Sequence, residues 1–176
     1  MKSRGLGPII ASDFSPARRA VAEKKGADII VDPAKVSPHS HWQAAGVAVS
    51  LSERTLRAMT GDTCKRAVIF ECVGVPGILQ SIIDAAPGGA QIIVAGVCMD
   101  TDRIEPFLCI TKQLDFRFVL GYSAVEFAAT LHNIAEGHID VLPAFTSEVG
   151  LSGVAAAFTA LADPEAQCKI IVRPGF

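Results

Sequence analysis

An acidic residue at the end of an apolar segment is the first feature that could do chemistry. Residues 8–13 are apolar up to Asp13, and Ser15 can then cap a helix. A carboxylate in that place can accept hydrogen bonds from both ribose hydroxyls of NAD, and it would repel the 2′-phosphate of NADP. Alternatively, Asp13 only ends the strand or caps the helix. Arg18, one turn later, could flank an adenosine, whereas we expect Arg19 to lie on a solvated helix face.

Three glycines each follow an apolar segment and could line a binding crevice. They are Gly74, Gly96 and Gly121. Glycine at the end of a strand lets a flat ring approach the backbone closely. A turn requirement would explain any one of them, but three at consecutive strand ends favour a crevice. Glu71 lies within one of these segments, and we expect this acid to be structural rather than catalytic.

Other catalytic and metal-binding patterns are missing from the sequence. The single G-x-G, Gly5-Leu6-Gly7, precedes the Asp13 segment and therefore does not fit the phosphate loop G-x-G-x-x-G. There is no C-x-x-C, H-E-x-x-H or G-x-S-x-G, so we predict neither catalytic nor metal-binding residues. We expect His39 and His41 to be solvated, and the five scattered cysteines to be reduced, buried thiols of a cytoplasmic protein.

The elements that must position these residues alternate along the chain. We expect strands at 8–13, 28–32, 67–73, 91–97, 116–120, 144–149 and 169–172. Helices are expected between them, at 16–25, 53–60, 76–86, 104–113, 123–136 and 154–161. This alternation predicts an α/β fold, a Rossmann-like parallel sheet with helices on both faces. The length of 176 residues, without a compositional break, predicts a single domain, 1–176.

Composition limits the choice of partners. The net charge of −2 predicts no basic face for nucleic acid. A hydrophobic fraction of 50% fits strands buried on both faces, or apolar surface covered by a partner or a missing domain. No apolar run reaches the length of about 18 residues that a membrane span requires. The N-terminus has no apolar stretch typical of a signal peptide.

Four segments together resemble the zinc-dependent medium-chain alcohol dehydrogenases. They are IIASDFSPARRAVAEKKGADIIVDP, VIFECVGVPGILQSIIDAAPGGAQIIVAGV, EFAATLHNIAEGHID and AFTALADPEAQCKIIVRP, and only residues 36–51 fit poorly. The resemblance implies that Asp13 binds the adenosine ribose, with Arg18 beside it. Nicotinamide-side contacts are implied for Val73, Gly74, Gly96, Val97, Leu120 and Gly121, and a pyrophosphate contact for Lys169.

In that family a catalytic domain with zinc comes first, followed by the first Rossmann strand and the glycine loop. The resemblance places all of these before Met1, so we expect zinc only in the missing domain. We also expect a Rossmann-like sheet that lacks its first strand and glycine-rich loop, with a gap between the strands ending at Asp13 and Val73. Segment 164–176 would rejoin the missing domain.

The implied function is that of the C-terminal part of an NAD-dependent, zinc-type alcohol dehydrogenase, which transfers hydride to NAD. We expect this chain alone to be inactive, with weak or absent NAD binding. One alternative is a non-catalytic nucleotide-binding or dimerisation module, a homo-oligomer formed by sheet extension between Val97 and Phe118. Another is a fragment of a zinc-free quinone or enone reductase, but many of those prefer NADPH, which Asp13 disfavours.

Overall fold

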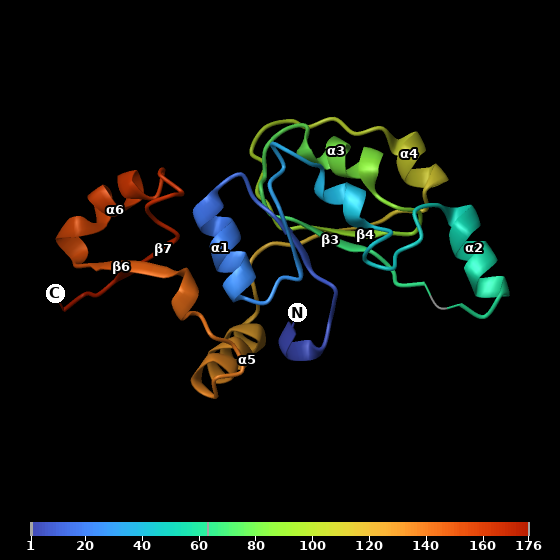
Figure 1. Cartoon of the computed structure of the whole chain (residues 1–176). Coiled ribbons are helices and arrows are strands. Elements are labelled where there is room, and N and C mark those ends of the chain that lie inside the picture. Colours follow the sequence, from blue (N-terminus) through green and yellow to red (C-terminus); the bar gives the residue numbers. More distant parts are fainter. Residues whose placement is uncertain (1, 63, 176) are drawn as a thin grey trace. The chain divides into compact units, whose positions relative to one another are not determined.

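The computed structural model describes residues 2–62 and 64–175, and its strands and helices alternate along the chain (Figure 1). The strands are β1 (Ile10–Ser12), β2 (Ile29–Val31), β3 (Val68–Glu71), β4 (Gln91–Val94), β5 (Asp115–Phe118), β6 (Phe145–Val149) and β7 (Lys169–Val172). The α-helices are α1 (Pro16–Lys24), α2 (Leu51–Met59), α3 (Ile78–Ala85), α4 (Pro106–Thr111), α5 (Ala124–Ala135) and α6 (Val154–Ala160). Short 3-10 helices are η1 (Lys2–Arg4), η2 (Pro38–His41), η3 (Leu142–Ala144) and η4 (Leu151–Gly153).

All pairings between these strands are parallel, which confirms the α/β prediction. The strands form three separate ladders, in the orders β1-β2, β3-β4-β5 and β6-β7. β1 and β3 belong to different ladders, and the absence of the first Rossmann strand stays a prediction. The separate β6-β7 ladder was not expected, because the sequence pattern predicts one sheet.

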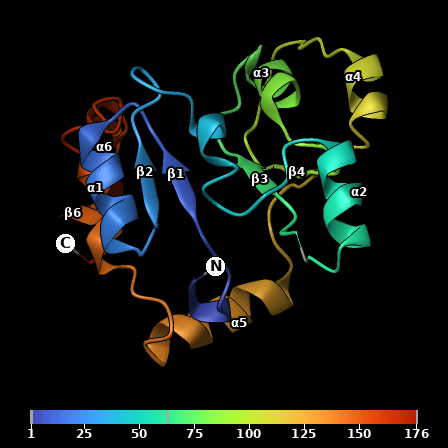
Figure 2. The same ribbon diagram turned by 45° about the vertical axis from the view of Figure 1, so that its right-hand side comes forward.

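The chain divides into two compact units. Unit 1 comprises Met1–Pro38 and Tyr122–Phe176, and unit 2 comprises His39–Gly121. Within unit 1, α1 packs against β1 and β2 (Figure 2). Most of the buried apolar residues belong to unit 2, including Ile69, Ile82, Ile83 and Ile92. The assignment of residues 1–176 to a single domain stays a prediction.

Two hydrogen bonds join the end of the chain to the start of α1 within unit 1. The Ser15 hydroxyl accepts from the Arg18 amide at 3.1 Å, as predicted for an N-cap, and donates to the Pro164 carbonyl at 3.4 Å. The Glu165 carboxylate accepts from the Ala17 amide at 3.3 Å. Segment 164–176 therefore begins against α1, and its return to a further domain stays a prediction.

The environments expected for the two loop histidines and for the cysteines are wrong. His39 and His41 are half-buried rather than solvated, because the segment before α2 folds onto the end of α3, where the Trp42 indole donates to the Ala85 carbonyl at 3.2 Å. All five cysteines are free, as expected, but none of them is buried, and Cys72 is exposed.

In the described part of the chain, no helix combines the length and apolarity needed to cross a bilayer.

Candidate functional site

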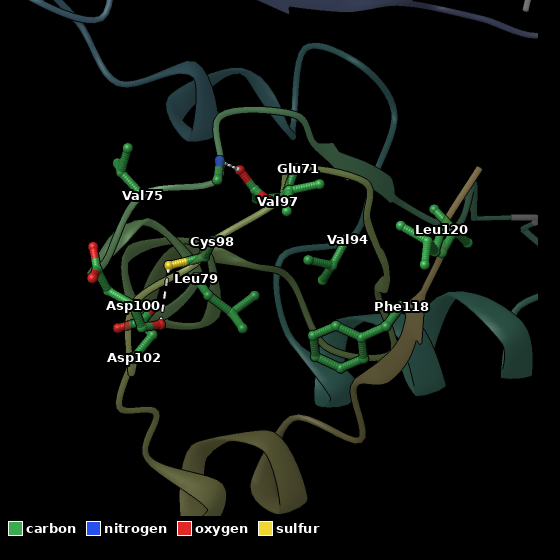
Figure 3. Close-up of a pocket in the computed structure, with 13 residues that line it drawn as sticks. Glu71, Val75, Leu79, Val94, Val97, Cys98, Asp100, Asp102, Phe118 and Leu120 are labelled. Atoms are coloured by element: carbon green, nitrogen blue, oxygen red, sulfur yellow. Dashed lines mark hydrogen bonds between the residues drawn. The ribbon is translucent and has the colours of Figure 1, made fainter.

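A pocket of about 340 Å³ lies in unit 2, at the carboxyl ends of β3, β4 and β5 (Figure 3). In a parallel sheet this end is where ligands bind. Apolar side chains make up most of the lining. Figure 3 shows Val94 and Phe118 on one side, Asp100 and Asp102 on the other, and Leu79 between them. The remaining lining residues are Glu71, Gly74, Val75, Gly96, Val97, Cys98, Val119 and Leu120.

Two of the predicted glycines are needed where the ends of β3 and β4 come together. Gly74 has φ of 71°, and a Cβ there would lie 2.6 Å from the Val97 nitrogen. A Cβ on Gly96 would lie 2.5 Å from a Glu71 carboxylate oxygen and would also contact the Gly74 nitrogen. Close packing of the backbone therefore requires both glycines before any ligand is considered. By contrast, Gly121 has open space around its Cβ position.

Glu71 ends β3, and its carboxylate is buried beside the pocket. One carboxylate oxygen accepts from the backbone amide of Val73 at 2.6 Å. The same oxygen accepts from the amide of Gly74 at 2.8 Å (Figure 3). These are the partners that the sequence could not identify for this acid. They satisfy its charge with backbone donors, which is the usual requirement for a buried carboxylate.

Asp102 fixes the loop that follows β4. Its carboxylate accepts from the Gly77 amide at 3.0 Å and from the Arg103 amide at 2.8 Å. Gly77 is the N-cap of α3, so Asp102 ties the loop to the start of that helix. The Cys98 thiol, in the same loop, donates to the Asp100 carbonyl at 3.4 Å. The polar side of the pocket is thus held by backbone contacts.

The structure brings together only part of the predicted site. The lining includes four predicted residues, Gly74, Gly96, Val97 and Leu120, whereas Val73 and Gly121 lie beside them in sequence without lining it. Asp13, Arg18 and Lys169 belong to unit 1. Sequence reasoning missed three apolar lining residues, Leu79, Val94 and Phe118, since they look like ordinary core positions.

Asp13 directly follows β1, and its carboxylate takes part in two interactions. It accepts from the Ser15 amide at 2.9 Å, and its second oxygen is 3.9 Å from the Arg18 guanidinium. The expectation that Arg19 is solvated is wrong, because its guanidinium donates to the Asp13 carbonyl at 2.7 Å and pairs with Asp32 at 3.3 Å. Asp32 follows the neighbouring strand β2, so Arg19 bridges the ends of two strands.

Metal-binding clusters and the exposed Cys72 thiol bear on the chemistry available among residues 2–62 and 64–175. No group of three His, Cys, Asp or Glu side chains is placed to hold a metal ion there. Desolvation, with a smaller contribution from the Glu71 charge, raises the pKa of the Cys72 thiol, which disfavours the nucleophilic thiolate.

The sequence of this chain is similar to those of dehydrogenases. Residues 1–136 match the family described as zinc-binding dehydrogenase. The (R,R)-butanediol dehydrogenase of Bacillus subtilis (strain 168) is 29% identical over 175 residues, which cover 99% of this chain and 46% of that protein. The chain thus spans about half the length of this relative.

Solved structures show the same likeness. A crystal structure of 2R,3R-butanediol dehydrogenase from Bacillus subtilis has a TM-score of 0.68 at 28% identity, covering 94% of this chain and 43% of that one. A protein from Sinorhizobium meliloti 1021 bound to NADP has a TM-score of 0.70 at 21% identity, covering 96% of this chain and 46% of that one. The latter identity supports a likeness of fold alone.

Proposed function

Because the chain belongs to the zinc-binding dehydrogenase family, we propose that it is the nucleotide-binding part of an NAD-dependent alcohol oxidoreductase. Its relatives include butanediol and sorbitol dehydrogenases, which supports an alcohol or polyol as the substrate of the whole protein. The chain spans only 46% and 40% of these two relatives. The proposal for the 176 residues themselves is therefore cofactor binding.

The observation that carries the proposal is the apolar pocket at the carboxyl ends of β3, β4 and β5. Its volume of about 340 Å³ lies within the range of small-molecule sites. Apolar walls from Leu79, Val94 and Phe118 suit a flat ring such as nicotinamide. Val97 and Leu120 are largely exposed at the same place, so both can contact a ligand. We assign the nicotinamide end of the cofactor to this pocket.

Asp13 supports a preference for NAD over NADP. Its carboxylate is partly exposed, and one oxygen is hydrogen-bonded only to a local amide, which leaves acceptor capacity for ribose hydroxyls. The bond to Ser15 equally fits the alternative, a residue that only shapes the turn before α1. One structural neighbour is bound to NADP and another is complexed with NADH, so the same fold accommodates either cofactor. Side chains such as Asp13 would then set the preference of this chain.

The cofactor would supply hydride transfer, and the residues of this chain would position it. The pocket walls would exclude water from one face of the ring, and the Asp13 carboxylate would hold the ribose. No described group of side chains fits a zinc ion, so we derive no step through zinc from these residues. We expect the purified chain to show no zinc-dependent oxidation of 2,3-butanediol with NAD, and measurable turnover would contradict this.

Weak NADH binding is the expected result that tests the proposal. Saturation-transfer NMR should show nicotinamide signals of NADH in contact with the purified chain. Val97→Trp, which fills the pocket, should remove them. Leu151→Trp is the matched control, because Leu151 is also 63% exposed but does not line the pocket. Absence of any NADH signal with the unmodified chain would overturn the proposed function.

The role of Asp13 is tested by cofactor choice. Asp13→Ala should weaken NADH binding by about tenfold, the equivalent of one charge-assisted hydrogen bond. It should also reduce the ratio between the dissociation constants for NADPH and NADH. Glu23→Ala is a control, because it removes an exposed carboxylate from α1. If Asp13→Ala leaves the NADH-to-NADPH ratio unchanged, the residue only shapes the turn.

A second candidate function, homo-oligomerisation, is favoured by the open edge of β5. This strand pairs only with β4 among the described strands, and Phe118 at its end is 68% exposed. Unpaired edges with apolar side chains are templates for pairing with another chain. The proposal is sheet extension within the predicted segment from Val97 to Phe118.

A further inference from the structure

Glu71 is the one charged side chain that is buried among residues 2–62 and 64–175, with 4% of its surface exposed. It also lines the pocket. Burial of an ionised group costs free energy unless hydrogen-bond donors or opposite charges are placed beside it. Its partners are not other side chains but the two backbone amides of Val73 and Gly74. Its carboxylate therefore shapes the chain immediately after β3.

The backbone of Glu71 holds β4 at the same point. Its carbonyl accepts from the amides of Ala95 and Gly96, each at 2.9 Å. A single residue thus contacts the chain after β3 through its side chain and the chain after β4 through its carbonyl.

The two glycines complete this arrangement. Gly96 leaves the space that the Glu71 carboxylate occupies, and Gly74 leaves the space that the Val97 backbone occupies. Glu71, Gly74, Gly96 and Val97, which we call the Glu71 cluster, are therefore mutually dependent in position. All four line the pocket.

We propose that Glu71 is a positioning residue, whose carboxylate sets the shape of the nicotinamide pocket by holding the Val73–Gly74 turn against Val97. This inference rests on the proposed function in taking NADH as the ligand of the pocket. The role of Glu71 in shaping the turn does not depend on that function. Without the carboxylate, two amides lose their acceptor and the turn can open away from Val97. The side chain does not need to touch the ligand to control how well the ligand fits.

Two variants separate the hydrogen bonds from the mere bulk of the side chain. Glu71→Gln keeps a carbonyl oxygen that can accept from both amides, whereas Glu71→Ala removes the acceptor. Gly96→Ala tests the same cluster independently, because its Cβ would enter the space of the carboxylate. Ile83→Val is the matched control, since it weakens the buried core of unit 2 without altering a pocket residue.

The purified chain and its variants are compared by amide hydrogen exchange at Val73 and Gly74, by the NMR shifts of Val97, and by NADH saturation transfer. We expect Glu71→Gln to resemble the unmodified chain. In Glu71→Ala and Gly96→Ala, the amides of Val73 and Gly74 should lose protection from hydrogen exchange, and the NMR signals of Val97 should shift. Both variants should bind NADH about tenfold more weakly, as for the loss of one charge-assisted hydrogen bond. Ile83→Val should lower the thermal midpoint but retain NADH binding.

The proposal is overturned if Glu71→Ala binds NADH as well as the unmodified chain, or if Ile83→Val weakens binding as much as Glu71→Ala. If Glu71→Ala does not fold, Gly96→Ala decides by the same criteria. A chain that binds no NADH, yet loses protection at Val73 and Gly74 in these variants, would overturn the proposed function and support the positioning role.

Discussion

His39 and Trp42 lie side by side in the segment that precedes α2, with ring centroids 5.8 Å apart. Burial, with the positive charge of Lys112 as the second cause, lowers the pKa of His39 below its ordinary value of 6.5. The unfolded chain therefore binds a proton at this histidine more readily than the folded chain does. The free energy of unfolding should fall as the pH drops below about 6.5, and level off below the folded-state pKa.

Trp42 is the single tryptophan, so its fluorescence reports on this histidine directly. Emission should decrease as His39 is protonated, because a protonated imidazole quenches a neighbouring indole. His39→Gln should remove both the quenching and this part of the pH dependence of unfolding. His132→Gln, which alters an exposed histidine of α5, is the control. A titration midpoint at or above 6.5 in the folded chain would contradict the prediction.

Single residues show how far sequence reasoning reaches. Glu71 could be singled out from the sequence, because an acid inside an apolar strand is unusual, but its partners lie in a turn whose shape depends on β4. Arg19 was misjudged for a related reason. Its main partners are backbone carbonyls at the end of β1 and a carboxylate after β2, and helical spacing alone contains no information about them.

At the scale of elements, Lys112 supports the end of α3 from another helix. Its ammonium donates to the carbonyls of Ile83 at 2.9 Å, Asp84 at 2.7 Å and Ala86 at 3.2 Å. Carbonyls at a helix C-terminus lack partners within the helix, and a cation there is favourable. Lys112→Met keeps the apolar stem but removes the donors. It should lower the free energy of unfolding by about 1–3 kcal/mol.

Chemical denaturation of the chain measures this effect. Lys24→Met is the matched control, because Lys24 is exposed in the last turn of α1, and it should change stability by less than about 0.5 kcal/mol. Lys112→Met should also raise the pKa of His39 towards 6.5, since it removes one of the two causes that lower it. Equal stability losses in the two variants would show that Lys112 acts only through its general charge.

Local capping signals predicted the elements well where they were recognised. The capping box of Ser123 and Glu126 begins α5 at Ala124, next to the expected start of this helix at residue 123. Helix α2 begins at Leu51 rather than Glu53, because Ser50 accepts from the Glu53 amide at 3.1 Å. Ser50 and Glu53 have the capping-box spacing, so the sequence contained this boundary too. The support from Lys112 could not be predicted, because its partners are 26 to 29 residues away along the chain.

At the scale of the whole molecule, the alternation of elements predicted the parallel α/β class, but not the three ladders or the two units. Alternation fixes the direction of each strand, whereas the order of strands depends on which edges meet. The pocket shows the same limit of prediction from sequence. Its glycines could be predicted because they follow apolar segments of the sequence. Phe118 and Leu79 could not be predicted, because they line the pocket only when β3, β4 and β5 pair in register.

The open edge of β5 leads to a prediction about assembly. Since Phe118 is 68% exposed and Leu120 is 90% exposed, an isolated chain of 18.5 kDa would leave apolar surface beside an unpaired strand. We expect the purified chain to associate and to elute from a sizing column above its monomer mass, increasingly so at higher concentration. Phe118→Lys places a charge on the edge and should shift the chain towards monomer, because lysine on an edge strand opposes pairing.

Leu142→Lys is the control for this change, because Leu142 is 73% exposed but lies outside β5 and the pocket. If association came from non-specific contacts between exposed apolar side chains, both lysine variants would reduce it equally. If it came from strand pairing, only Phe118→Lys would, and backbone amides of β5 would be protected from hydrogen exchange in the associated form. A chain that elutes as a monomer at every concentration would refute sheet extension.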